Sequence, residues 1–393
     1  MEICFNQLLC AFSNALSYVE KDYLLTTTFH GKKIAYFCYL IGQYYQLNDK
    51  DLNDFIGCAI LHDNGLTEYY KYGESVKDND FLKIHCLVGE DNIKLLPFYD
   101  NIKNVIKYHH ENAEGSGPFQ LTFQDTPLLS QIIHICDWAD IEYYLENMSL
   151  AQYNQMIKEM KELKDIQFTG EMLDVFEKVI TYDVIKNYPE KINTFLQEGS
   201  HILYHELSNS EMLSICHLFA RVIDGKSHHT SSHSIGVASK ATRMGIYYHF
   251  DEDTLSKLFF AGAMHDVGKL IISRDILEKP ERLTNQEYAY IQTHAYYTYT
   301  ILKEMALGEI VNWASYHHEK LDGSGYPFGK KANELDFNSR LMACCDIYQA
   351  LTESRPYKEP ISHEDTITIM RKMAQENKID KQIVEDMDEI FKD

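Results

Sequence analysis

The sequence lacks several features that would place it in common classes of protein. No uninterrupted apolar run reaches the roughly 20 residues that a membrane-spanning helix needs. The N-terminus has no basic region followed by an apolar segment and a small-residue cleavage site, so no secretory signal is expected. The nine cysteines are scattered without a Cys-x-x-Cys pair, which is typical of reduced thiols. These absences predict a cytoplasmic protein that does not enter a membrane.

Positive charge is also scarce. The chain has 37 Lys and Arg against 59 Asp and Glu, which gives a formal net charge of −22. Duplex nucleic acid is bound mainly through basic residues, so this balance argues against such a partner. A small phosphorylated ligand stays open, because a few local cations or metal ions reverse the potential inside a cleft.

Alternating strand patterns are missing as well, and apolar residues recur at helical spacing. Two such stripes are Leu52, Phe55, Ile56, Ala59 and Ile60, and Leu255, Leu258, Phe259, Gly262 and Ala263. Each predicted helix ends near a His-Asp pair and a glycine, Gly65 or Gly268. A length of 393 residues suits two domains. We therefore expect two all-α domains, residues 1–200 and 201–393, with the boundary in the polar stretch 197–212.

The two halves repeat one pattern. "FIGCAILHDNG" (55–65) and "LFFAGAMHDVG" (258–268) are offset by 203 positions, and later matches are offset by 208 or 209. Seven residues of metal-ligand type recur in the same order, which indicates an internal duplication. In the second half they are His233, His265, Asp266, His294, His317, His318 and Asp346. In the first half they are His30, His62, Asp63, His85, His109, His110 and Asp137.

Imidazoles and carboxylates suit iron, manganese or zinc rather than a metal selected by thiolates. Seven donors are too many for one structural zinc, which takes about four. They suit two ions with Asp266 as the natural bridge. Two such ions would hold a hydroxide and polarise a phosphoryl oxygen for in-line attack on phosphorus. The alternative for any single histidine is a hydrogen-bonded core residue, but this explains the ordered repeat of all seven poorly.

The second half also contains "HDVGK", "KPERLTNQEY", "HHEKLDGSGYP" and "RPY". With these motifs, about residues 220–385 resemble the HD-GYP family, a branch of the HD-domain phosphohydrolases, and about residues 15–150 resemble it in degenerate form. The resemblance implies tandem HD-type helical domains, a centre of two or three iron or manganese ions, and hydrolysis of a cyclic dinucleotide to a linear dinucleotide or mononucleotide. Cyclic di-GMP is the usual substrate, and 3′,3′-cyclic GMP-AMP is the substrate of some similar tandem members.

Carried onto this sequence, the resemblance implies that His233, His265, Asp266 and Asp346 surround one metal ion. Asp266, His294, His317 and His318 would surround the other. Lys269 matches the family lysine that contacts the scissile phosphate, and Arg355 and Lys358 match further phosphate-binding cations. Tyr326 would contact a base or phosphate. The alternatives are a solvated loop for Arg355 and Lys358 and simple packing for Tyr326.

Some positions depart from the family pattern. A glutamate that marks three-metal members is replaced by His229, which leaves the number of metal ions open between two and three. In the first half, Leu66 stands at the Lys269 position, and Glu146 and Ser149 stand at the Arg355 and Lys358 positions. The tyrosine of the Gly-Tyr-Pro motif is deleted there, leaving Gly117-Pro118. We therefore expect the first half to bind metal without hydrolysing substrate, and to act as a sensory, regulatory or dimerising partner.

Two other functions stay open at this point. The protein would be a signalling receptor if it bound a cyclic dinucleotide with little turnover, although intact Lys269 and the full donor set disfavour this. It would be a general phosphohydrolase if it acted on mononucleotides or other phosphate esters, which the "GSGYP" loop disfavours.

Overall fold

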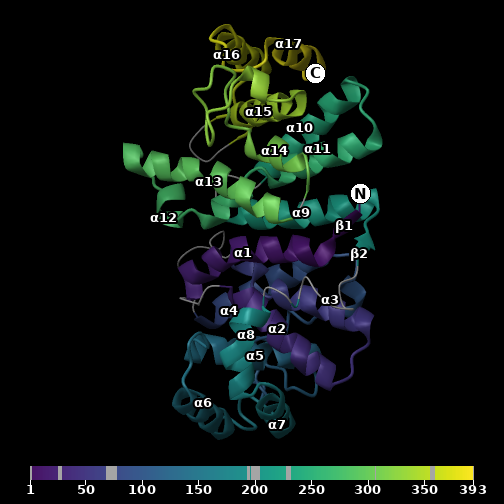
Figure 1. The fold of residues 1–393 in the computed structure, drawn as a ribbon, viewed down its shortest axis with the longest axis vertical. Coiled ribbons are helices and arrows are strands. Elements are labelled where there is room, and N and C mark those ends of the chain that lie inside the picture. Colours follow the sequence, from purple (N-terminus) through teal and green to yellow (C-terminus); the bar gives the residue numbers. More distant parts are fainter. Residues whose placement is uncertain are drawn as a thin grey trace. The chain divides into compact units, whose positions relative to one another are not determined.

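The chain folds into two compact helical units, Glu2–Glu206 and Leu207–Asp393. The computed structural model describes residues 2–24, 29–67, 78–192, 195, 204–226, 232–305, 307–354 and 359–392. The all-α fold and the internal duplication are confirmed, since helices that carry the same donors recur in the same order in both units (Figure 1). None of the described helices is long and apolar enough to cross a membrane.

The N-terminal unit is built from helices and one short antiparallel ribbon. In the ribbon, Glu2 of β1 lies opposite Glu206 of β2. The helices that carry the candidate site are α2, α4 and α5. The elements in chain order are β1 (Glu2–Cys4), α1 (Phe5–Leu24), α2 (His30–Tyr44), α3 (Asp49–Ile60), α4 (Asp78–Ile93), the 3-10 turn η2 (Tyr99–Asn101), α5 (Leu128–Tyr143), α6 (Leu150–Glu162), α7 (Gly170–Val179), α8 (Tyr182–Lys191) and β2 (Tyr204–Glu206).

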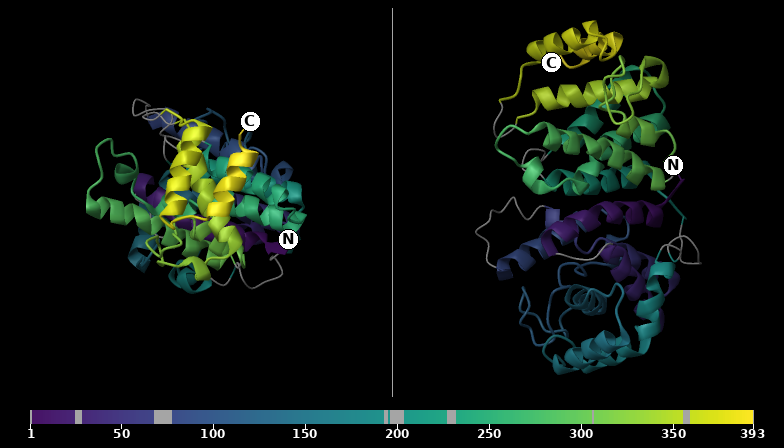
Figure 2. Two further views of the ribbon diagram at one scale, coloured as in Figure 1. Left: turned by 90° about the horizontal axis from the view of Figure 1, so that it is seen from above. Right: turned by 60° about the vertical axis from the view of Figure 1, so that its left-hand side comes forward.

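The C-terminal unit is also helical and ends with two helices, α16 and α17, which lie side by side (Figure 2). Its elements are α9 (Asn209–Gly225), α10 (His233–Tyr247), α11 (Glu252–Met264), the 3-10 turn η3 (Val267–Ile271), α12 (Arg274–Leu277), α13 (Asn285–Glu304), α14 (Ile310–Ser315), the 3-10 turn η4 (Ala332–Glu334), α15 (Phe337–Thr352), α16 (His363–Gln375) and α17 (Lys381–Ile390).

Local sequence explains where the helices of the site begin. Thr284 caps α13 by accepting a hydrogen bond from the Glu287 backbone N–H. The Glu287 carboxylate in turn accepts one from the Thr284 backbone N–H. Asp251 caps α11 and Asp336 caps α15 in the same way through their carboxylates. The predicted stripe in α3 is entirely buried. The caps thus fix where these helices begin, and the buried stripe fixes which face of α3 packs inward.

Gly268 follows the C-terminal end of α11, as the sequence predicted. Its φ angle is not positive, so it does not close the helix through a left-handed conformation. It lies within η3, where an added Cβ would sit 2.0 Å from the backbone oxygen of His294. Gly268 is therefore required for the close approach of η3 to α13, which brings two parts of the site together.

Candidate metal centres

The C-terminal unit brings all seven predicted donors to one place. Each comes from the end of a helix or from a turn next to one, except for two that project from within long helices. His233 begins α10, His265 and Asp266 follow α11, and His317 and His318 follow α14. His294 projects from α13 and Asp346 from α15.

The first group of donors surrounds one face of Asp266. Donor atoms of His233, His265 and Asp266 all lie within 4.8 Å of one another. Asp266 Oδ2 is 3.2 Å from His265 Nε2 and 3.9 Å from His233 Nε2. Asp346 Oδ1 completes this group at 3.2 Å from His233 Nε2.

The second group faces the other oxygen of Asp266. Donor atoms of His294, His317 and His318 also lie within 4.8 Å of one another. Asp266 Oδ1 is 3.4 Å from His294 Nε2 and 3.9 Å from His317 Nε2. One carboxylate therefore presents an oxygen to each group, as a bridge between two ions requires.

The hydrogen bonds behind the imidazoles determine which nitrogen faces the site. Nδ1 of His265, His294 and His317 each donates to the backbone oxygen three residues earlier, at 2.6–2.8 Å. Their Nε2 atoms are therefore unprotonated acceptors. Nε2 of His294 and of His317 lie 3.3 Å apart, so two lone pairs face each other.

Two buried acceptor atoms of the centre have no hydrogen-bond donor within the described part of the chain. Among the described residues, Asp266 Oδ1 and His265 Nε2 are buried without a hydrogen-bond partner. Orphaned buried acceptors are costly unless a cation or water satisfies them. The donor set and these atoms together fit divalent cations.

The charge states favour cation binding. Burial lowers the pKa of His294 to about 4 and that of His317 to about 3, so both rings are neutral near pH 7. Burial alone would raise the pKa of Asp266, but His265 and Lys269 outweigh it and hold the pKa well below its usual range. His294 and His317 thus offer neutral imidazoles and Asp266 an ionised carboxylate, which are the forms that bind metal. The pKa of His233 is instead raised to about 9, because hydrogen bonds to Asp346 and Glu353 outweigh its burial.

Two of the predicted substrate-binding residues lie at the edge of this centre. Lys269 Nζ contacts Asp266 Oδ2, and its side chain is 25% exposed. The ring of Tyr326 packs 4.7 Å from the ring of His318. Arg355, Lys358 and His229 lie outside the described residues.

Glu319 has a role that the sequence patterns did not reveal. Its carboxylate accepts hydrogen bonds from the backbone of Phe328 at 2.7 Å and Lys330 at 2.9 Å. Glu111 makes the equivalent bonds to Phe119 and Leu121, both at 2.6 Å. The glutamate of each "HHE" motif therefore holds the following loop in place, and the repeat of that motif was the available signal.

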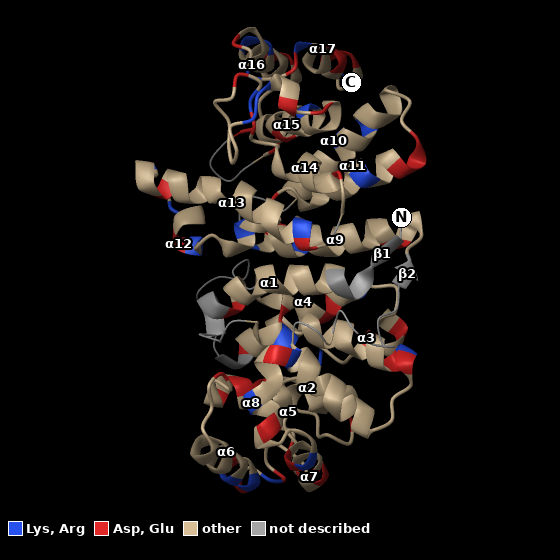
Figure 3. Cartoon of the chain, viewed as in Figure 1, with Lys and Arg blue, Asp and Glu red and all other residues tan. Residues whose placement is uncertain are grey.

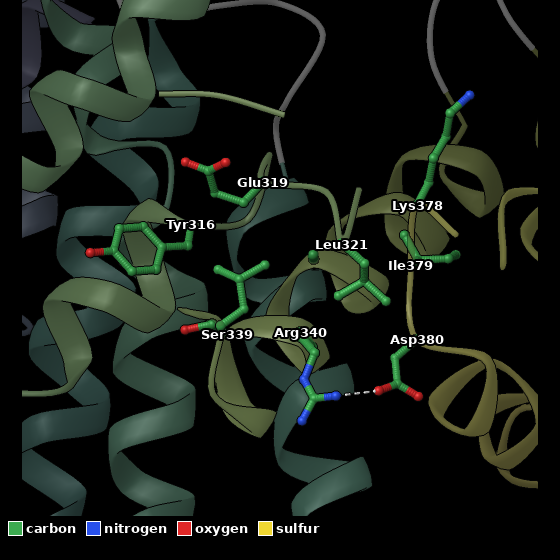
Figure 4. A pocket seen from close by; sticks show the side chains of 10 residues that line it. Tyr316, Glu319, Leu321, Ser339, Arg340, Lys378, Ile379 and Asp380 are labelled. Carbon is green, nitrogen blue, oxygen red and sulfur yellow. Dashed lines mark hydrogen bonds and ion pairs between the residues drawn. The ribbon is translucent and has the colours of Figure 1, made fainter. Parts of the chain in front are cut away.

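A small pocket lies behind this loop, between Tyr316, Glu319 and the Arg340–Asp380 ion pair (Figure 4). Arg340 Nη1 is 2.8 Å from Asp380 Oδ2. None of the seven predicted donors lines this pocket in the described part of the chain. It is therefore separate from the candidate centre.

The N-terminal unit gathers its seven donors in the same pattern. His85 Nε2 is 3.2 Å from Asp63 Oδ1, and His62 Nε2 is 3.5 Å from Asp63 Oδ2. His30 Nε2 is 3.0 Å from Asp137 Oδ1. His109 lies with its Nε2 3.4 Å from that of His85, and His110 Nδ1 is 4.0 Å from Asp137. This unit thus preserves the bridging geometry.

The surroundings of the N-terminal set differ. Leu66, at the position of Lys269, is buried, and Glu146, at the position of Arg355, is exposed. Ser149, at the position of Lys358, caps α6 through its hydroxyl. Over the described residues of both units, Lys and Arg are interspersed with Asp and Glu (Figure 3). The N-terminal unit thus keeps its seven donors, but it has no Lys or Arg at the positions that align with Lys269, Arg355 and Lys358.

The sequence of the C-terminal unit, which holds the two groups of donors around Asp266, matches a known domain family. Residues 217–383 match the sequence profile of the HD domain family. The resemblance to HD-domain proteins seen in the motifs is therefore confirmed, and the family profile itself covers the C-terminal unit.

Its relatives are phosphodiesterases. The chain is 26% identical over 370 residues to 3′3′-cGAMP-specific phosphodiesterase 1 of Vibrio cholerae, covering 90% of this chain and 85% of that one. It is 26% identical to 3′3′-cGAMP-specific phosphodiesterase 3 of the same organism, covering 74% of this chain and 63% of that one. It is 32% identical to a cyclic di-GMP phosphodiesterase of Thermotoga maritima over 38% of this chain and 41% of that one.

A solved structure shares the fold of the whole chain. It is the crystal structure of a cyclic GMP-AMP specific phosphodiesterase of Vibrio cholerae, V-cGAP3. The TM-score is 0.68 at 20% identity, and the match covers 100% of this chain and 98% of that one.

Proposed function

We propose that the C-terminal unit hydrolyses a phosphodiester bond of a cyclic dinucleotide, using two divalent metal ions, iron or manganese, held on either side of Asp266. The chain is a hydrolase of the HD-domain class, in line with its relatives. The observation that carries the metal-dependent mechanism is the placement of the two Asp266 oxygens, one toward each group of histidines.

The bound metal ions would polarise a phosphoryl oxygen and activate water. The chain's own residues supply the rest. Histidines with Nδ1 tied to backbone oxygens keep Nε2 directed into the centre. Lys269, partly exposed beside Asp266, would bind the scissile phosphate by a charge-assisted hydrogen bond. Tyr326, packed on His318 at the rim, offers a ring to a base.

For the substrate, we propose 3′,3′-cyclic GMP-AMP first and cyclic di-GMP second. The motifs alone put cyclic di-GMP first, because it is the usual substrate of the family they resemble. The relative that aligns with both halves of the chain is named as specific for 3′3′-cGAMP, whereas the cyclic di-GMP relative from Thermotoga maritima aligns with 38% of the chain. A panel of both dinucleotides, with product analysis, decides the order.

The N-terminal unit is proposed to bind metal without catalysing hydrolysis. Its donor geometry is intact, but the position of Lys269 is taken by buried Leu66. Charge-assisted hydrogen bonds contribute about 1.5–3 kcal/mol each, so a phosphate loses substantial binding there.

The test is the variant Asp266→Ala in the full chain, loaded with iron or manganese under anaerobic conditions. Turnover of both dinucleotides should be abolished, because the bridge between the two donor groups is removed. Turnover close to that of the wild type would show that the other unit carries the activity. Single-turnover assays on the wild type separate an enzyme from a receptor that binds without cleavage.

A further inference from the structure

The first histidine of each centre is held differently from five of the other site histidines. His62, His109, His265, His294 and His317 donate Nδ1–H to a backbone oxygen three residues earlier. His30 and His233 instead turn Nδ1 toward a carboxylate. A carboxylate partner fixes the ring and makes its other nitrogen a stronger donor to metal than a carbonyl partner does.

The two units obtain this carboxylate from different positions. In the N-terminal unit it is Asp140, three residues after Asp137 in α5, with Oδ2 2.7 Å from His30 Nδ1. Its other oxygen accepts from Lys33 at 2.6 Å, and all of these side chains are buried. The buried Lys33 ammonium group thus fixes the Asp140 carboxylate, and Asp140 in turn fixes the His30 ring.

The C-terminal unit has neither the aspartate nor the lysine of the Asp140–Lys33 pair. α5 and α15 are 16 residues each, and α2 and α10 are 15 each, so Gln349 stands at the position of Asp140 and Gly236 at that of Lys33. The Gln349 amide fills the space beside Gly236, where an added Cβ would lie 2.3 Å from Nε2. Its Oε1 accepts from Lys240 at 2.5 Å. Gln349 is therefore occupied elsewhere.

Glu353 supplies the carboxylate that faces Nδ1 of His233. Its Oε2 is 3.0 Å from His233 Nδ1, and its Oε1 accepts from Ser232 at 3.3 Å. Glu353 follows the last residue of α15 in an extended conformation, with φ −79° and ψ 136°. The equivalent Tyr144 has φ 46°, a left-handed conformation, and is 49% exposed. The change at the helix end is what directs Glu353 back to the centre.

We infer that Glu353 is the positioning residue that orients His233 toward the metal ions, in place of the carboxylate that the N-terminal unit supplies from within its helix. Four differences between the units agree with one another: Gln349 for Asp140, Gly236 for Lys33, Glu353 for Tyr144, and the conformation after α15. The effect on turnover rests on the proposed function, whereas the effect on metal affinity does not.

The test removes the carboxylate of Glu353 and then supplies one from position 349, which is equivalent to Asp140. Glu353→Ala removes it, and Glu353→Ala with Gln349→Asp restores it from within α15. Metal-free protein is titrated with Mn²⁺ in an Asp63→Ala background, so that the signal reports the C-terminal centre. We expect Glu353→Ala to weaken Mn²⁺ binding about 10- to 100-fold, the usual range for such outer partners. Gln349→Asp should recover most of that loss.

Matched variants separate orientation from general damage. Glu389→Gln removes a carboxylate from an exposed position of α17 and should leave Mn²⁺ binding unchanged. Glu353→Gln keeps an acceptor without its charge and should fall between the wild type and Glu353→Ala, which also provides a reading if the alanine variant fails to fold. Unchanged Mn²⁺ affinity in folded Glu353→Ala, or a loss that Gln349→Asp does not recover, overturns the inference. A wild type that binds Mn²⁺ but cleaves no dinucleotide would instead refute the proposed function.

Discussion

At the scale of single residues, the chemistry of each centre depends on a few atoms rather than on composition. Both units keep the bridging aspartate and the surrounding imidazoles. They differ at one side chain next to that bridge, which is Lys269 in one unit and Leu66 in the other. Because a phosphate needs a cation at this point, this difference supports the proposal that only the C-terminal centre hydrolyses its substrate.

Lys269→Ala should lower kcat/KM for the cyclic dinucleotide about 10- to 150-fold, the equivalent of one charge-assisted hydrogen bond. Metal content should be unchanged, because the lysine contacts Asp266 but is not itself of ligand type near neutral pH. Steady-state kinetics and elemental analysis measure the two effects. Lys257→Ala, which removes an ion pair with Glu309 in the same unit, serves as the control. Loss of metal from Lys269→Ala would contradict its assignment to substrate.

Glu20 is a second residue with a measurable consequence. It is buried in α1, and among the described residues neither of its carboxylate oxygens has a hydrogen-bond partner. Burial raises its pKa from 4.5 to about 7, and His30 opposes this only in part. The folded state therefore binds more protons than the unfolded state between these pH values, so stability falls as pH rises through them.

Glu20→Gln should remove this dependence in the metal-free protein. Relative to the wild type, the variant should gain about 2–3 kcal/mol more unfolding free energy at pH 8 than at pH 5. Urea unfolding at the two pH values measures the difference, which is independent of any fixed effect of burying the amide. An equal change at both pH values would show that Glu20 is already ionised in the fold.

At the scale of elements, the site depends on how closely a turn approaches a helix. Gly268 in η3 contacts α13 directly, and its backbone N–H donates to Thr298 Oγ1 at 3.1 Å. Thr298 in turn donates to the His265 backbone oxygen at 2.9 Å. This contact sets the spacing between Asp266 and His294, and so between the two groups of donors.

Gly268→Ala should destabilise the protein by about 1–3 kcal/mol, because the added methyl overlaps the His294 backbone. Metal affinity should fall as well, since His294 is displaced. Chemical denaturation and Mn²⁺ titration measure these effects. Gly170→Ala is the control, because its Cβ would meet only the flexible end of Lys164. Unchanged stability and Mn²⁺ affinity in Gly268→Ala would mean that η3 and α13 can move apart without harm to the site.

At the scale of the whole molecule, each centre is built entirely within one unit. The N-terminal donors lie between residues 30 and 137, inside Glu2–Glu206, and the C-terminal donors lie between residues 233 and 346. No donor is shared between the two sets. The alignment to a relative over 90% of the chain shows that both units belong to the common arrangement.

Removing one bridge should therefore leave the other centre loaded. Asp63→Ala should lose the metal of the N-terminal unit alone, Asp266→Ala that of the C-terminal unit alone, and the double variant should lose both. Elemental analysis of anaerobically purified protein measures the metal ions per chain. Complete loss of metal from either single variant would show that the two centres depend on each other.

The helical class, the duplication and the residues that gather at each centre were predictable from the sequence. Apolar residues at helical spacing define the buried faces, and His and Asp residues in a repeated order indicate one shared site. The partners of His30 and His233 were not predictable. Asp140 and Glu353 lie at non-equivalent positions, and the choice between them depends on the φ and ψ angles after a helix.

The sequence by itself thus determined which donors exist and in what order, because residue type and spacing are written in it directly. Only the tertiary structure decided which oxygen of Asp266 faces which group, which nitrogen of each imidazole is free, and which carboxylate holds the first histidine. These are questions of direction at distances of a few Å between segments up to about 120 residues apart. Such directions are set by packing between helices and carry no local signature in the chain.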